Sequence, residues 1–269
     1  RGIHMTNTQK VAQSAAMIAI FTLISKFLGF LREILIAYTY GSGYETDTYF
    51  LAMTATVIIM TIVGAALNTT LVPIFTEIDQ KRGKEGKLEF LNNILNMIFF
   101  LSIILALLGF VFSPKIIKIL ARGFEGEQFQ LAVKLNRIGL PIIVFLGFTY
   151  VFSGFLHSSE IFGPPAIMGL PYNLVFIIFL VFFAKEGKIE SLMLVSVIAA
   201  STQFLIQLPA VKYQGYKYSL DIDLKDPYLQ KALFLVIPVL IGSAVHQLNI
   251  IVDKTLASGL AEGSISALT

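Results

Sequence analysis

The sequence predicts an all-α integral membrane protein, built as a polytopic helical bundle. Of its 269 residues, 56% are hydrophobic and only 14% are charged, and the mean hydropathy is +0.78. A soluble domain usually carries about 25% charged residues. The apolar runs are long and continuous, whereas the strands of a membrane β-barrel are short and alternate between apolar and polar residues.

Seven stretches reach the length of about 20 mostly apolar residues that a transmembrane helix needs. We expect helices over residues 12–40, 48–76, 90–112, 136–156, 166–184, 191–211 and 228–257. Residues 79–87 predict an exposed basic loop. Residues 113–134 mix basic and apolar side chains, which is typical of an interfacial amphipathic helix followed by a loop. Kinks or tolerated bends are expected at Pro141, Pro171, Pro209 and Pro238.

These elements predict a domain order. Residues 1–4 precede Met5 and are typical of a cloning scar. Residues 5–212 form an N-terminal lobe of six transmembrane helices, residues 213–227 a cytoplasmic connector, and residues 228–269 the start of a C-terminal lobe with the seventh helix. We expect the chain to be incomplete, because the last residues begin another segment and stop.

Orientation follows from the excess of Lys and Arg in cytoplasmic loops. Residues 81–87 hold four basic residues and residues 41–47 hold none, which predicts a cytoplasmic N-terminus. The basic residues of 113–134 then lie on the outer side, against the rule.

Composition also excludes several function classes. The net charge of +3 is small and no basic stripe occurs, so we expect no nucleic-acid partner. The chain has no cysteine and only three unclustered histidines, so neither thiol chemistry nor a transition-metal site is expected. We find no catalytic triad, Walker-type loop or carboxylate dyad. The sequence therefore predicts no enzyme and no cofactor, and any energy must come from an ion gradient, the membrane potential or a partner.

The first apolar run carries three charges, on Lys26, Arg32 and Glu33. A charge at the centre of a lipid-facing helix costs roughly 2.5–3.5 kcal/mol on insertion scales, so such residues normally face a bundle interior or a water-filled cavity. Residues seven apart share nearly one helix face, which stacks Ser25 with Arg32 and Lys26 with Glu33. These residues predict one broad polar face on the first helix.

Two interpretations of this face remain open. In the structural one, Lys26 and Glu33 form an internal ion pair and Arg32 extends to the membrane interface. In the functional one, the face binds an anionic ligand. The planar fork of Arg32 suits phosphate, Lys26 adds a point charge, and Glu33 orients Arg32 or limits the net charge.

A second polar cluster lies in the seventh predicted helix. Asp253 and Lys254 either pair at a helix end, or Asp253 binds sodium or a proton, with the amide of Asn249 one turn earlier as a further oxygen ligand. His246 is either a pH-sensitive group or a packing residue. In the sixth predicted helix, Gln203 and Gln207 are expected to make interhelical hydrogen bonds.

A family resemblance is carried mainly by the first helix and the turn after it. The matching residues are Ser25-Lys26-x-Leu28-Gly29-Phe30-x-Arg32-Glu33, Ala37, Gly41-x-Gly43 and Thr46-Asp47-x-Tyr49-Phe50, with weaker matches at 72–75, 139–141, 203–209 and 256–268. They resemble the MurJ (MviN) family of lipid II flippases, in the MOP exporter superfamily. The resemblance implies two six-helix lobes around a central cavity, of which this chain supplies the first lobe and the first helix of the second.

The resemblance also implies a function. The protein is expected to move lipid II, the undecaprenyl-pyrophosphate-linked peptidoglycan precursor, across the bacterial cytoplasmic membrane by alternating access, as a monomer among membrane lipids. Its expected substrate-binding residues are Arg32, Lys26, Glu33, Ser25 and Asp47. Asp253 is similar to a carboxylate linked with sodium in some members. Many members carry Arg or Lys near residues 53–61, where this chain has no charge.

Two other functions remain open. A related exporter would carry another polyprenyl-linked saccharide or small organic cations, but a cation exporter should present an acidic cavity and the first helix here is net basic. A non-transporting scaffold subunit would not need three charges on one face within the membrane.

Overall fold

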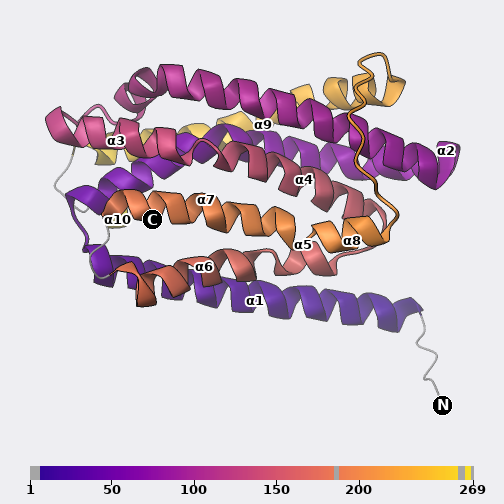
Figure 1. Cartoon of the computed structure of the whole chain (residues 1–269), viewed down its shortest axis with the longest axis horizontal. Coiled ribbons are helices and arrows are strands. Elements are labelled where there is room, and N and C mark those ends of the chain that lie inside the picture. Colours follow the sequence, from indigo (N-terminus) through magenta and orange to yellow (C-terminus); the bar gives the residue numbers. More distant parts are fainter. Residues whose placement is uncertain (1–6, 185–187, 260–263, 268–269) are drawn as a thin grey trace.

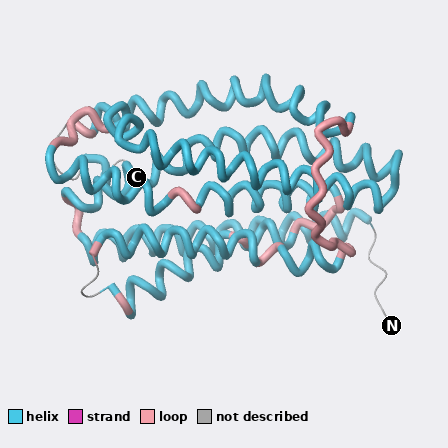
Figure 2. The backbone as a smooth tube through the Cα atoms, turned by 45° about the horizontal axis from the view of Figure 1, so that its top comes forward, coloured by secondary structure: helices cyan, strands magenta, loops and turns pink. Residues whose placement is uncertain are grey.

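The computed structural model describes residues 7–184, 188–259 and 264–267, and every regular element in these ranges is a helix (Figures 1 and 2). This confirms the predicted all-α fold class. The helices are α1 Asn7–Tyr40, α2 Tyr44–Leu120, α3 Gly126–Gly139, α4 Ile142–Ser158, α5 Gly163–Ile167, α6 Gly169–Phe182, α7 Ile189–Leu205, α8 Leu208–Tyr213, α9 Pro227–Ala257 and α10 Ser264–Ala267.

Several of these helices can span a membrane by length and composition. Within the described ranges they are α2, the stretch Gly163–Phe182, the stretch Ile189–Tyr213 and α9. The bent pair α3–α4 makes a further span if it is taken as one. The charged helix α1 is not among them.

The long helix α2 contains the second and third predicted helices as a hairpin. It turns at Gly83, whose φ of 67° is a backbone angle that glycine adopts readily. A loop over 79–87 is therefore wrong, because helix continues on both sides of this glycine, whereas the predicted exposure is confirmed for residues 79–85. Lys87 is also buried. Its Nζ lies 2.9 Å from Ser159 Oγ and 3.3 Å from Asp79 Oδ2, so polar partners replace the water that the loop prediction assumed.

The segment after the third predicted helix also differs from the prediction. Helix α2 runs through Pro114 to Leu120, and α3 begins at Gly126, so the break falls at 121–125. A buried hydrogen bond explains this extension. Ser113 Oγ donates to Asn136 Oδ1 at 2.7 Å and joins the end of α2 to α3.

Two of the predicted proline kinks are helix breaks. The axes of α3 and α4 meet at 41° next to Pro141, and α7 gives way to α8 just before Pro209. Pro171 and Pro238 lie inside α6 and α9 without a break. Proline removes one backbone donor, which a helix end tolerates better than a helix interior.

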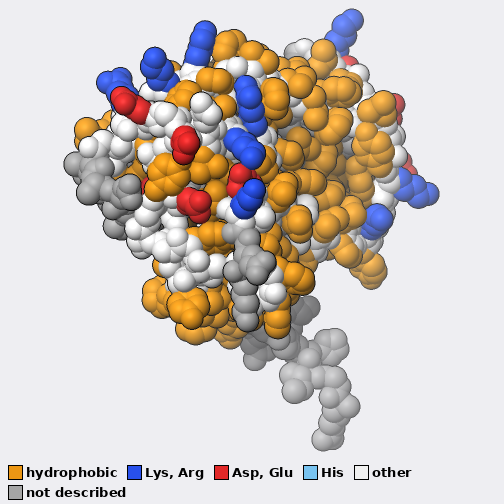
Figure 3. Space-filling model, turned by 60° about the vertical axis from the view of Figure 1, so that its left-hand side comes forward, with side chains coloured by type: hydrophobic (Ala, Val, Ile, Leu, Met, Phe, Trp, Pro, Cys, Tyr) orange, Lys and Arg blue, Asp and Glu red, His pale blue; other side chains and the backbone are white. Residues whose placement is uncertain are grey.

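The helices form a chain of neighbours across the bundle. Helix α1 packs along α6, α6 along α7, α7 along α4, and α4 along α2, which also contacts α9. The start of α1, the hairpin at Gly83 and the connector 214–226 share one end of the bundle, and the α1–α2 turn and α10 share the other (Figure 1). Figure 3 shows charged side chains gathered on this second end, with hydrophobic side chains on the flanks.

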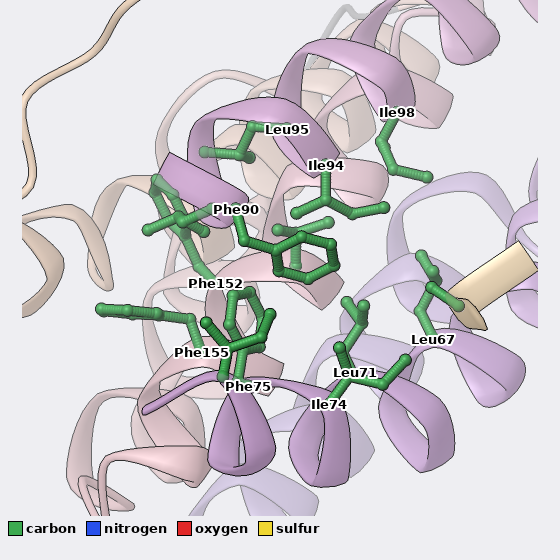
Figure 4. Packing of buried hydrophobic residues seen from close by; sticks show 14 of the residues in the cluster. Leu67, Leu71, Ile74, Phe75, Phe90, Ile94, Leu95, Ile98, Phe152 and Phe155 are labelled. Atoms are coloured by element: carbon green, nitrogen blue, oxygen red, sulfur yellow. The ribbon is translucent and has the colours of Figure 1, made fainter. Parts of the chain in front are cut away.

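The largest buried cluster fills the space between the two halves of α2 and α4 (Figure 4). The ring of Phe75 meets Phe90 edge-on at 5.2 Å between centroids and Phe155 at 5.5 Å. Edge-to-face pairs of this kind add about 0.5–1.5 kcal/mol beyond the area they bury. The hairpin and α4 are therefore held together by aromatic packing.

The connector 214–226 has no regular structure but is fixed to the second half of α2. Asn92 donates to the Lys217 carbonyl at 3.0 Å and accepts from the Ser219 amide at 3.1 Å. Asn93 forms the same pair of bonds with the backbone of Asp223, and Asn96 donates to two connector carbonyls. Three asparagine side chains thus satisfy backbone groups that a β-strand partner would otherwise bind.

Close packing within the bundle depends on glycine at particular points. A Cβ atom on Gly64 would lie 2.2 Å from the ring of Tyr150, and one on Gly147 would lie 2.7 Å from Ile98 Cγ2. Small residues at such points let membrane helices approach closely.

We predict that Gly64→Ala lowers the free energy of unfolding by about 1–3 kcal/mol, because the added methyl group overpacks against Tyr150. Thermal unfolding of the full-length protein measures this. The double variant Gly64→Ala/Tyr150→Leu should lose less stability than the sum of its single variants. An additive double variant would contradict the proposed contact.

Candidate functional site

Arg32 and Glu33 line a pocket between α1, the first half of α2 and α6. Its volume is about 160 Å³. The remaining lining residues are Ile36, Tyr49, Phe50, Met53, Thr54, Val57 and Tyr172. The pocket therefore combines one ion pair with mainly apolar and aromatic walls, and water around the charges is restricted.

Four neighbours position the guanidinium group of Arg32. Its Nε donates to Glu33 Oε1 at 3.2 Å, Nη2 donates to the same oxygen, and Nη1 donates to Asn173 Oδ1 at 3.1 Å. The group also lies 5.5 Å from the ring centroid of Tyr172 and 5.3 Å from that of Phe176. One N–H on each terminal nitrogen has no acceptor among the described residues. Arg32 is thus oriented and keeps donors for a ligand.

Asn173 is a site residue that the sequence analysis missed. It is 5% exposed, and while its Oδ1 accepts from Arg32, its Nδ2 donates to the backbone carbonyl of Ser25 at 3.0 Å. A Cβ atom on Gly169 would lie 2.1 Å from Ser25 Oγ, so α6 approaches α1 closely here. An isolated asparagine in an apolar helix was the available signal, since such residues commonly bond between membrane helices.

The structure brings only part of the predicted substrate-binding set together. Glu33 pairs with Arg32, so the alternative Lys26–Glu33 ion pair is wrong and the expected orientation of Arg32 by Glu33 agrees with the structure. The guanidinium group of Arg32 points to Asn173 on α6. Seven residues of helix separate Lys26 from Glu33 by about 10 Å along the axis. Lys26 is exposed on α1, and the hydroxyl of Ser25 lies against Gly169.

Asp47 lies outside the Arg32 pocket. It is 4% exposed, and its Oδ1 accepts from the backbone amide of Ser266 at 2.7 Å and from the hydroxyl of the same residue. This carboxylate joins the start of α2 to α10. Lys254 is also buried, and its charge interacts with Asp47 and Glu33. A role of Asp47 in substrate binding stays a prediction.

The predicted cation ligands lie on α9. Asp253 and Asn249 are both exposed and one turn apart. Within the described ranges, no three His, Cys, Asp or Glu side chains gather to hold a metal ion. The sodium role of Asp253 therefore stays a prediction, and the side chain of His246 lies outside the described residues. Gln207 does bond between helices as expected, since it accepts from Ser153 Oγ on α4 at 3.0 Å.

Comparison with known proteins decides the family. A model of the family described as lipid II flippase MurJ matches residues 36–269. The chain belongs to the MurJ family. This confirms the family resemblance found in the sequence.

Individual relatives agree with this assignment. The chain is 28% identical to lipid II flippase MurJ of Burkholderia cenocepacia, over 91% of this chain and 49% of the relative. It is 30% identical to the probable lipid II flippase MurJ of Buchnera aphidicola subsp. Schizaphis graminum, over 95% and 51%. The chain thus spans about half the length of the curated relatives it matches.

Solved structures give the same fold. A lipid II flippase MurJ in an inward closed conformation matches with a TM-score of 0.75 and 25% identity, over 94% of this chain and 53% of that one. An inward-facing multidrug resistance MATE transporter matches with a TM-score of 0.63 and 17% identity, over 94% and 59%. The second likeness shows the fold alone.

We predict that Asn173→Ala lowers the free energy of unfolding by about 1–3 kcal/mol, because Arg32 Nη1 and the Ser25 carbonyl lose their hydrogen bonds to the Asn173 side chain. The loss should be smaller in an Arg32→Ala background. Chemical or thermal unfolding of the full-length protein provides the measurement. Ser25→Ala is the control, since it keeps the carbonyl that Asn173 binds. Equal losses in both backgrounds would rule out the Arg32–Asn173 contact.

Proposed function

We propose that the whole protein translocates lipid II across the membrane by alternating access, with Arg32 holding the pyrophosphate. The observation that carries this proposal is the guanidinium group of Arg32, fixed by Asn173 in the pocket with two N–H donors left over. Paired donors in one plane match two oxygens of a phosphate group. Membership of the MurJ family supports the identity of the substrate.

The neighbours of Arg32 have distinct proposed roles. Glu33 keeps the guanidinium in register and offsets its charge until an anion enters. Lys26 lies six residues earlier, about 9 Å along the helix, so it attracts the anion electrostatically instead of sharing one phosphate with Arg32. The wall formed by α2 includes Met53, Thr54 and Val57, which bound the pocket without adding a charge.

The proposed setting is a bacterial cytoplasmic membrane, with the protein as a monomer. We place the start of α1, the Gly83 hairpin and the connector in the cytoplasm. The basic residues of the hairpin, Lys81, Arg82, Lys84 and Lys87, support this orientation.

Replacing Arg32 tests the proposal directly. Arg32→Ala in the full-length protein should abolish complementation in cells depleted of their own lipid II flippase, because the pyrophosphate loses its fixed donors. Arg32→Lys should be impaired, since a lysine keeps the charge without the planar fork. Binding of labelled lipid II to the purified protein, compared with organic cations, separates this function from that of a cation exporter.

The control is Arg122→Ala, which removes an exposed arginine outside the pocket. It should leave complementation intact. Full activity of a folded Arg32→Ala protein would contradict the proposed role of Arg32 in binding the pyrophosphate. Full activity of Arg32→Lys would show that binding needs only a positive charge and not the planar fork.

We also propose that sodium binds at Asp253 as the coupling ion, with Asn249 as a neighbouring oxygen donor. Sodium should then raise the melting temperature of the full-length protein more than potassium does, by mass action on the folded state. Asp253→Asn should remove the difference, whereas Asp221→Asn, which neutralises an exposed connector residue, should keep it. An unchanged sodium effect in Asp253→Asn would exclude this ligand.

A further inference from the structure

The end of the bundle opposite the Gly83 hairpin carries basic residues that the proposed function does not use. They are Lys115, Lys118, Arg122, Lys134 and Arg137. In the proposed orientation they face the outer side, where the distribution of Lys and Arg predicts few cations. Acidic residues, among them Glu125 and Glu127, lie at the same end, so the local arrangement of the cations decides where an anionic partner can bind.

Two of these cations border a groove between the end of α2 and α3. The groove has a volume of about 490 Å³. Its apolar walls include Phe110, Phe129, Val133 and Ile138, and its charged lining residues are Lys134 and Arg137. Phe110 is 51% exposed and its neighbour Val111 is 66% exposed. The groove therefore continues into an apolar flank that faces lipid in a membrane protein.

Arg137 is held in place at this groove. Its Nε donates to the Phe110 carbonyl at 3.2 Å, and its guanidinium group stacks 4.6 Å from the ring centroid of the same residue. The two terminal nitrogens have no acceptor among the described residues. An arginine fixed in this way presents a planar pair of donors at low entropic cost.

Lys134 adds a second cation on the same helix face, one turn before Arg137. The Nζ atom of Lys134 forms an ion pair with Glu190 Oε1 at 2.9 Å, so one acidic group also lies at the edge of the groove. On α2, Lys118 follows Pro114, a lining residue, by one turn. The groove thus has an apolar floor and a net positive edge.

We propose that this groove binds an anionic phospholipid. The headgroup phosphate takes the terminal N–H groups of Arg137 and the charge of Lys134, and the first part of an acyl chain lies between Phe110 and Phe129. The two cations favour an anionic headgroup. Because the groove continues into the lipid-facing flank, a lipid fits it better than a soluble anion does. A lipid in this position joins the end of α2 to α3, far from the Gly83 hairpin.

The test uses the full-length protein purified in detergent and titrated with phosphatidylglycerol or phosphatidylcholine, with bound lipid measured by native mass spectrometry. The wild type should retain phosphatidylglycerol in preference. Because hydrogen bonds to charged groups are the stronger class, Arg137→Gln should weaken phosphatidylglycerol binding about tenfold. The affinity of Arg137→Lys for phosphatidylglycerol should lie between those of the wild type and Arg137→Gln, since lysine keeps the charge without the planar fork.

The matched control is Arg122→Gln, which removes the same charge from an exposed position at the same end but outside the groove. It should bind phosphatidylglycerol like the wild type. An equal loss in Arg122→Gln would show a general charge effect and overturn the site, as would a wild type without preference for the anionic lipid.

A second variant keeps the test decisive if Arg137→Gln unfolds. Gln130→Trp fills the groove from an exposed wall position and leaves both cations in place. It should reduce phosphatidylglycerol binding by excluding the acyl chain, with an unchanged melting temperature in lipid-free detergent. Undiminished binding in this variant would overturn the proposal.

Discussion

The two hydrogen bonds of Asn173 make it possible for α1 to carry an arginine inside an apolar bundle. One amide group accepts from the guanidinium of Arg32, which Glu33 also binds, and donates to the backbone carbonyl of Ser25, so the charge and the helix that bears it are fixed to α6 together. A buried charge without such partners would cost far more than the few kcal/mol that hold a protein folded. Together with Glu33 and the rings of Tyr172 and Phe176, this side chain sets the direction in which Arg32 presents its donors.

The rest of the pocket is held by contacts that leave its centre accessible. Tyr49, in the wall formed by α2, has its hydroxyl 2.9 Å from Ser196 Oγ on α7, within the core. Asp47, two residues earlier, binds Ser266, which fixes the start of α2 from the other side. Because these polar groups are satisfied by one another, they do not compete for the free N–H groups of Arg32. The groove at Arg137 repeats this arrangement at the surface, with an aromatic ring and a backbone carbonyl as the fixed partners.

The sequence predicted the helices well and the contacts between them poorly. Long apolar runs define membrane helices almost without regard to their neighbours, so the extents of α1 and α9 and the breaks beside Pro141 and Pro209 could be anticipated. The burial of Lys87 could not, because it depends on the end of α4, about 70 positions away in the chain. Helix faces alone left the partner of Glu33 open between Lys26 and Arg32, and the structure shows that it is Arg32. Asn173 could have been flagged as unusual, but its two partners on α1 are visible only in three dimensions.

The asparagine contacts to the connector determine where the molecule can bend. Asn92, Asn93 and Asn96 bind the main chain from Lys217 to Asp223, and Arg82 reaches Asp226, the N-cap of α9, so the connector moves as one body with the hairpin. A linker fixed in this way is no hinge, despite having no helix or strand. Bending between the connector and the later part of α9 would then fall within α9 itself. Pro238, which donates no backbone hydrogen bond, is the position where bending that helix costs least. The two parts of α9 before and after Pro238 would then change their relative angle at this proline.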